Sequence, residues 1–219
     1  PKLEKHVNKI VSKNFFETYR NGLDEIKNAY GNKDTKILGF KEVWTNEFIP
    51  PLIKSFKNIK IIQIIRDPRA VIASNYAKKN EKYPLLFLCR QWRKLASLSY
   101  LYNEKYKNIL NIKYEDLIEN TDVVSREICK FLKIDFDPNI LDPSKFKDGN
   151  NNSWSQNTSY ENSKNEFNIN SIYKWKEFLN KSQIQIIESL CGAEMRLFKY
   201  KHSLSSISYL SGKNIIKND

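Results

Sequence analysis

Side chains suited to holding an anion follow an apolar run in the first third of the chain. The run from Lys60 to Ile65 leads directly into Arg66, and Ser74 and Lys78 come next at helical spacing. An arginine between a strand end and a helix start is well placed for a phosphate, because its guanidinium offers forked donors and the helix dipole adds positive potential. Two turns of helix return the Ser74 hydroxyl to roughly the face on which Arg66 enters, with Lys78 one turn beyond. A structural role, in which Arg66 pairs with a neighbouring carboxylate at a helix start, fits the positions equally well.

The elements that must position these residues alternate between strands and helices. The stretch Lys60 to Ile65 is rich in β-branched isoleucine, which predicts a strand buried on both faces. Asp67-Pro68 predicts an N-cap followed by proline in the first turn of a helix that runs to about Lys78. Short apolar runs predict parallel strands at Thr35 to Phe40 and at Ile109 to Lys113. This order indicates an α/β domain with a parallel sheet, whose ligands bind beyond the carboxyl ends of the strands.

Helical periodicity and one long polar stretch account for most of the remaining sequence. Between residues 2 and 30 the apolar spacing predicts two helices that break at Asn21-Gly22 and end at Gly31-Asn32. Further helices are predicted at about 85–106, 121–133, 172–179 and 182–195, the last capped by Ser182. The stretch from Asp142 to Asn170 is rich in Asn, Ser and Lys, and a loop of this length is typical of a functional lid or of a disordered connection.

The composition predicts a single globular domain. The chain has 219 residues, of which 40% are hydrophobic, and no change of composition divides it. No apolar run approaches the ~20 residues needed to cross a bilayer. The formal net charge of +12 attracts anionic ligands. Because the lysines are scattered rather than clustered, this charge favours a compositional bias over a nucleic-acid surface.

The cysteines indicate the redox environment. Cys89, Cys129 and Cys191 show neither close pairs nor metal-ligand spacing, so we expect no disulfide framework and no structural zinc. A single long-range bridge would instead imply a secreted or lumenal protein. Glycosylation triplets occur, but an asparagine-rich chain yields them readily. We therefore expect a cytoplasmic enzyme.

Several segments resemble the sulfotransferases that use 3′-phosphoadenosine 5′-phosphosulfate as donor, in particular the carbohydrate, tyrosylprotein and bacterial branches. The run from Ile64 to Val71, followed by Ser74, resembles the segment that binds the 3′-phosphate of the donor. The resemblance implies that Arg66 and Ser74 bind this phosphate and that Lys78 assists them.

Three further segments extend the resemblance over about residues 37–200. The sequence IKYEDL at 112–117 is similar to a strand end whose tyrosine lies near the nucleotide, which implies that Tyr114 contacts the donor. The sequence LGFKEV at 38–43 is similar to the strand that delivers a catalytic lysine. Lys41 would then lie beside the bridging oxygen between phosphate and sulfate, where negative charge grows in the transition state. The sequence GNNNSW at 149–154 resembles the loop that folds over the donor, which makes Asn152 and Ser153 candidate phosphate ligands.

The resemblance implies both a fold and a reaction. The fold would be a P-loop-NTPase-like parallel sheet flanked by helices, of the sulfotransferase type. The reaction would move a sulfuryl group, without a metal, from the donor to a hydroxyl or amine of an acceptor, for which we expect a carbohydrate. The family begins with a strand and a glycine-rich loop that wraps the 5′-phosphosulfate. This sequence shows no such loop, so we expect the chain to lack the first strand, loop and helix. No general base is singled out among His6, Glu17 and Glu42.

Three other interpretations compete with this one. The chain could be a non-catalytic nucleotide-binding remnant. A P-loop phosphotransferase would need a Lys-Ser or Lys-Thr cradle and a Mg²⁺-binding aspartate after a strand, and the sequence shows neither. A nucleic-acid-binding module would rest on the net charge alone and would show steep salt dependence.

Overall fold

The computed structural model describes residues 4–8, 10–42, 45–76, 83–147, 152–153 and 169–203. The chain divides into two compact units. The first consists of Pro1–Ile59 and Lys147–Ser153, and the second of Lys60–Phe146 and Trp154–Asp219. The single domain predicted from composition stays a prediction.

The regular elements described in the first unit are helices. Its elements are α1 (Glu4–Val7), α2 (Phe15–Tyr30), the 3-10 helix η1 (Thr45–Phe48) and α3 (Ile49–Ser55). The α2 helix begins after Asn14, whose side chain accepts a hydrogen bond from the backbone of Glu17. It then continues through Asn21-Gly22, so the predicted break there is wrong and the interruption lies before residue 15 instead. The predicted end at Gly31 is confirmed.

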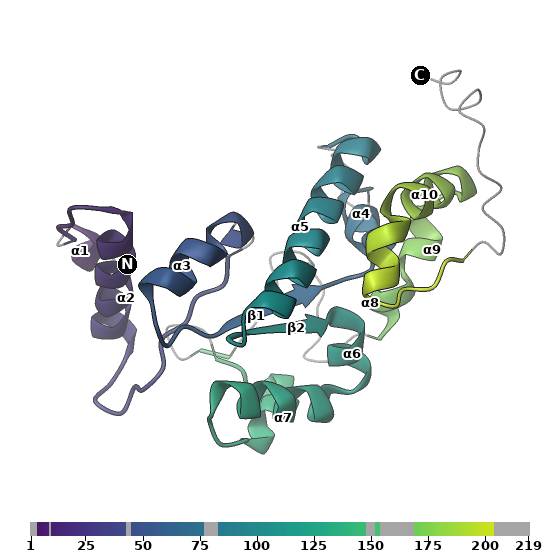
Figure 1. The fold of residues 1–219 in the computed structure, drawn as a ribbon. Helices are drawn as coiled ribbons and strands as arrows, with labels where there is room; N and C mark the ends of the chain where they lie inside the picture. The colour runs from purple at the N-terminus through teal and green to yellow at the C-terminus, as the bar shows by residue number, and fades with distance from the viewer. Residues whose placement is uncertain are drawn as a thin grey trace. The chain divides into compact units, whose positions relative to one another are not determined.

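The second unit holds the sheet and the remaining helices (Figure 1). Its first half contains β1 (Ile61–Ile65), α4 (Pro68–Tyr76), α5 (Leu85–Lys105) and β2 (Ile109–Lys113). Its second half contains α6 (Tyr114–Glu119), α7 (Thr121–Leu132), η2 (Pro138–Leu141), η3 (Pro143–Lys145), α8 (Asn170–Tyr173), α9 (Trp175–Phe178) and α10 (Lys181–Leu197). The strands predicted at 60–65 and 109–113 and the predicted helices beginning at residues 68, 85 and 121 are thereby confirmed.

The strands β1 and β2 run parallel and end at the same level. Ile61 pairs with Ile109 at one end and Ile65 with Lys113 at the other, so the residues that follow the two strands emerge side by side. One face of the pair contacts α5, because the Ser99 hydroxyl accepts a hydrogen bond from Gln63 at 3.1 Å. On the other face the Lys60 ammonium lies 4.7 Å from the centre of the Phe131 ring of α7. Figure 1 shows α5 and α7 on opposite sides of the strands.

The core of the second unit lies where α4, α5 and α10 meet. Five of its side chains have no exposed surface at all: Ile72, Cys89, Ile187, Cys191 and Met195. All three cysteines are free and buried. A core of this kind fixes α4 against two long helices, and α4 is the helix that begins at the predicted anion site.

Two expectations about strands are wrong. Residues 35–40 form no strand, and Ile37 and Phe40 are about half exposed. A strand is stable only when neighbouring backbone pairs with it, and no described segment does so there. The strand β1 is also not buried on both faces, because Ile64 is 57% exposed.

The helices near the carboxyl end differ from the prediction in two ways. The predicted helix at 172–179 is two short helices, α8 and α9, separated at Lys174. The next helix is capped by Asn180 rather than Ser182: the Asn180 side chain accepts from the Gln183 backbone, and the Gln183 side chain accepts from the Asn180 backbone. The short helix α6, directly after β2, was not predicted.

Candidate functional site

The peptide unit between Arg66 and Asp67 is fixed on both sides. Its carbonyl, from Arg66, accepts a hydrogen bond from the Trp92 indole at 2.9 Å. Its N–H, from Asp67, donates to the Glu115 carboxylate at 2.9 Å. Because both polar groups of one planar unit are held, the point at which the Arg66 side chain leaves the backbone is set by its surroundings.

The start of α4 is organised by a buried ion-pair network around Arg69. The Asp67 side chain accepts from the Arg69 backbone at 2.8 Å, which confirms the predicted cap. The Arg69 guanidinium donates to Asp67 at 2.6 Å and also to Glu188 of α10, and it lies 4.3 Å from the centre of the Trp175 ring. The pairing with a carboxylate at the helix start, which we considered for Arg66, is therefore made by Arg69.

The pKa values in this network favour the charged forms. Burial lowers the pKa of Arg69, but hydrogen bonds from its guanidinium to Asp67 and Glu188 outweigh burial and raise that pKa above its usual range. Burial raises the pKa of Glu188, while hydrogen bonds from Ser203 and Arg69 lower it, and the net result lies below the usual 4.5. Both groups thus stay ionised in the folded protein at neutral pH.

Arg66 makes contacts of another kind. Its Nη2 donates to the carbonyl of Ser171, in α8, at 2.7 Å. Its guanidinium carbon lies 4.4 Å from the centre of the Tyr114 ring, and the Tyr114 hydroxyl is 2.9 Å from the Ser171 hydroxyl. Its Nε is buried without a hydrogen-bond partner among the described residues. The end of β1, the start of α6 and α8 therefore converge on one guanidinium.

Ser74 lies on the same small cavity as Arg66. The Ser74 hydroxyl donates to the Val71 carbonyl at 2.6 Å. The cavity has a volume of about 10 Å³ and is lined by Arg66, Ala70, Ala73, Ser74, Ser171, Lys174, Trp175 and Phe178. A cavity of this size holds about one water molecule. The structure thus brings Arg66 and Ser74 together, while their role as phosphate ligands stays a prediction.

Glu115 and Tyr200 join the two strand ends and were not anticipated from the sequence. The Tyr200 hydroxyl donates to the Glu115 carboxylate at 2.8 Å and lies 3.3 Å from the Ile65 carbonyl. Burial, with the nearby Glu115 charge, raises the pKa of Tyr200 far above its usual range, so the hydroxyl keeps its proton. The short sequence IKYEDL held a signal for Glu115. Ser171 had none, because it follows a long polar stretch without periodicity.

The remaining predicted site residues belong to the first unit or lie outside the described residues. Lys41 is exposed in an irregular part of the first unit. Asn152 and Ser153 are also exposed and belong to that unit, where Ser153 forms an isolated antiparallel bridge with Lys147. Lys78 lies outside the described residues. The roles of these four residues stay predictions.

The candidate general bases His6 and Glu17 make hydrogen bonds within the first unit. The Nδ1 atom of His6 lies 2.6 Å from the Glu25 carboxylate. The Glu17 carboxylate accepts from the Lys13 backbone at 2.8 Å. These contacts give His6 and Glu17 local structural roles, and they do not select a base.

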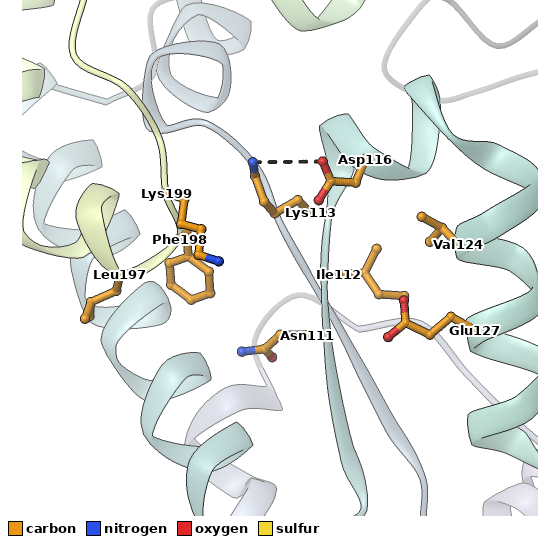
Figure 2. Close-up of a pocket in the computed structure, with 9 residues that line it drawn as sticks. All are labelled: Asn111, Ile112, Lys113, Asp116, Val124, Glu127, Leu197, Phe198 and Lys199. Carbon is orange, nitrogen blue, oxygen red and sulfur yellow. Dashed lines mark ion pairs between the residues drawn. The ribbon is translucent and has the colours of Figure 1, made fainter.

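A larger cavity of about 290 Å³ lies beside β2 (Figure 2). It is lined by Asn111, Ile112, Lys113, Asp116, Val124, Glu127, Leu197, Phe198 and Lys199. The Lys113 ammonium is 4.0 Å from the Asp116 carboxylate, the ion pair drawn in Figure 2. Two lysines and two carboxylates give this cavity no net preference for an anion. The Arg66 cavity is therefore the better candidate for a phosphate.

A membrane span and a metal centre are two further features on which the described residues bear. No helix in the described part of the chain has the length and apolarity that crossing a bilayer requires. Within the same residues, no three His, Cys, Asp or Glu side chains gather as they would around a metal ion. The expectation that the reaction needs no metal stays a prediction.

Comparison with known proteins relates the chain to sulfotransferases. The model of the sulfotransferase domain matches residues 44–199, which is more than half of the chain. Carbohydrate sulfotransferase 3 of Tetronarce californica is 27% identical over 180 residues, covering 71% of this chain and 39% of that protein. The Mus musculus protein of the same name is 26% identical over 196 residues, covering 79% and 40%. The chain thus spans about two fifths of the length of these relatives.

A solved structure has a similar fold. The sulfotransferase domain from the curacin biosynthetic pathway matches with a TM-score of 0.60 and 19% identity, over 84% of this chain and 68% of that one. Together with the parallel strands and flanking helices, this match establishes the α/β sulfotransferase fold.

Proposed function

This chain belongs to the sulfotransferase-domain family, and on that basis we propose that it takes part in sulfuryl transfer from 3′-phosphoadenosine 5′-phosphosulfate to a hydroxyl or amine. One observation carries the proposal. Arg66, at the carboxyl end of a parallel strand, and Ser74, two turns into the helix that follows, line the same cavity. Parallel sheets bind their ligands at this edge, and an arginine beside a helix start suits a phosphate.

In the proposed reaction the acceptor oxygen or nitrogen attacks sulfur. The bond between sulfur and the oxygen of the 5′-phosphate breaks in line, and the acceptor gives its proton to a base. Arg66 and Ser74 hold the 3′-phosphate, with the Tyr114 ring beside the nucleotide. Lys41, Lys78, Asn152 and Ser153 complete the proposed site. A lysine near the bridging oxygen would stabilise the charge that develops there.

The acceptor that we propose is a carbohydrate. The support is that the relatives reported above are named carbohydrate sulfotransferases. The cytoplasmic localisation expected from the sequence is proposed on the sequence alone.

Nucleotide binding tests the donor directly. Calorimetric titration of this chain with 3′-phosphoadenosine 5′-phosphate should give tighter binding than titration with AMP, which lacks the 3′-phosphate. Arg66→Ala should weaken the first by roughly 10- to 100-fold, because a hydrogen bond to a charged group contributes about 1.5–3 kcal/mol. Arg90→Ala, which removes an exposed arginine of α5, is the matched control and should bind as the parent does. Equal affinity for the two nucleotides would remove the argument.

Transfer tests the acceptor separately. Incubation with donor carrying radiolabelled sulfate should label a glycan acceptor and release 3′-phosphoadenosine 5′-phosphate. Labelling of a peptide or a small phenol, with glycans unlabelled, would refute the carbohydrate proposal while leaving sulfuryl transfer intact.

A further inference from the structure

One donor of Arg66 and the hydroxyl of Ser74 are each engaged by a backbone carbonyl. The Arg66 Nη2 donates to Ser171 at 2.7 Å, and the Ser74 hydroxyl donates to Val71 at 2.6 Å. The cavity between Arg66 and Ser74 measures about 10 Å³, which is room for about one water molecule and not for a phosphate. This conformation, called closed below, must therefore change before a phosphate enters.

Ser171 is the residue that holds the closed conformation together. Its carbonyl accepts from Arg66, and its hydroxyl is 2.9 Å from that of Tyr114. The Tyr114 ring in turn lies 4.4 Å from the Arg66 guanidinium carbon. Ser171 itself is only 8% exposed. It belongs to α8, a helix of four residues, and so short a helix depends on such side contacts for its position.

The closed conformation leaves one strong donor unused. The Nε of Arg66 is buried and has no hydrogen-bond partner among the described residues. Burying an arginine donor without an acceptor is costly. A phosphate offers several acceptor oxygens in an arrangement that a guanidinium engages through two parallel bonds. The Ser171 carbonyl satisfies a single N–H of Arg66, whereas a phosphate can satisfy two. A phosphate therefore binds the conformation in which Arg66 is released from Ser171 more tightly than the closed conformation.

We infer that Ser171 is a positioning residue of the donor site, whose carbonyl holds the Arg66 guanidinium in the closed conformation and yields it to the ribose-linked phosphate. This inference rests on the proposed function. No covalent bond changes: one N–H···O=C contact is exchanged for N–H···O–P contacts, and α8 moves away from Arg66 as a unit. The contact between the Ser171 and Tyr114 hydroxyls sets the rate at which α8 moves away from Arg66, because this contact holds α8 in place and does not involve the phosphate.

Stopped-flow binding of 3′-phosphoadenosine 5′-phosphate tests the inference. Where opening precedes binding, the observed rate reaches a plateau at high ligand concentration that equals the opening rate. Ser171→Ala removes the hydroxyl contact and keeps the carbonyl. We expect its plateau to rise and its dissociation constant to fall, each by about 2- to 10-fold, the range that one neutral hydrogen bond corresponds to.

Three further variants test whether the lost hydroxyl contact causes the change in the plateau. Tyr114→Phe removes the same contact from the other partner and keeps the ring beside Arg66, so it should shift the plateau in the same direction. Ser171→Thr keeps a hydroxyl and should restore the parent plateau. Ser182→Ala, an exposed serine of α10, should leave the plateau unchanged. Thermal melts confirm that each variant is folded before its rates are compared.

The possible failures are distinguishable. If the parent chain and every variant fail to bind the nucleotide, the proposed function falls and the inference falls with it. If the parent binds and Ser171→Ala has the same plateau, the positioning role is refuted alone. If Ser171→Ala binds more weakly with an unchanged plateau, the hydroxyl is a direct ligand and the inference is wrong.

Discussion

Replacing Arg69 by methionine removes a guanidinium that pairs with two buried carboxylates, Asp67 and Glu188. The side chains of Arg69, Asp67 and Glu188 are 6%, 8% and 1% exposed. Methionine matches the length of the arginine stem and can still pack on the Trp175 ring, so the change isolates the charge. Breaking a buried ion pair by removing one partner costs about 3–5 kcal/mol, because the remaining charge is buried unpaired.

The predicted magnitude can be measured by unfolding. A loss of this size lowers the melting temperature by roughly 6–20 °C in a protein of this length. Urea titrations followed by tryptophan fluorescence give the free energy directly, and Trp92 and Trp175 both report on the second unit. The double variant Arg69→Met with Glu188→Gln should recover part of the loss, since it removes one of the stranded charges.

The matched control is Arg126→Met. Arg126 pairs with Asp122 one turn away in α7, with side chains 58% and 50% exposed, and an exposed pair of this spacing contributes no more than about 0.5 kcal/mol. If Arg69→Met costs less than about 1 kcal/mol, or no more than the control, the network around Arg69 does not stabilise the start of α4 and the reasoning fails.

Three further predictions concern stability. The pKa of Glu188 is lowered in the folded protein, so the Glu188 carboxylate contributes stability at pH values above the usual 4.5, and this stability is lost as the pH falls through the folded pKa. Thermal melts from pH 6 to 3 should show this loss of stability, and Glu188→Gln should reduce the dependence of the melting temperature on pH. Asn180→Ala removes the cap that accepts from the Gln183 backbone and should cost about 1 kcal/mol in a urea titration, whereas an unaffected midpoint would contradict the capping role. At Gly31 an added methyl would lie 2.6 Å from the Lys27 carbonyl, so Gly31→Ala should lower the melting temperature of the first unit, and an unchanged transition would show that the helix end shifts freely.

The strands and helices around the candidate site could be predicted from sequence where a local rule determines them. The β-branched run that became β1 and the Asp67-Pro68 helix start are examples, because propensity and capping act within a few residues. The prediction failed where residues distant in the sequence determine whether an element forms. Residues 35–40 have the composition of a strand, yet a strand needs backbone to pair with, and sequence gives no sign of which neighbour is present.

The contacts of the site show the same division. Helical spacing places Arg66 and Ser74 on one cavity, which the sequence could anticipate. The partner of Arg66 could not be anticipated: Ser171 lies 105 residues away and is brought close only by the packing of α8 on α4. For the same reason, the sequence could not show that Arg69 forms the pairing with carboxylates that we considered for Arg66. Periodicity indicates which face a side chain occupies, and tertiary packing decides what it meets.

The doubly anchored peptide unit after β1 has a consequence for comparing variants. Since the Trp92 indole and the Glu115 carboxylate clamp its two polar groups, the main chain at position 66 is insulated from whatever side chain is placed there. A series such as lysine, glutamine and alanine at this position would therefore share one backbone frame. Differences among them would reflect the contacts of the side chain with Ser171, Tyr114 and the phosphate, whereas an insertion or deletion beside position 66 would break the two backbone contacts.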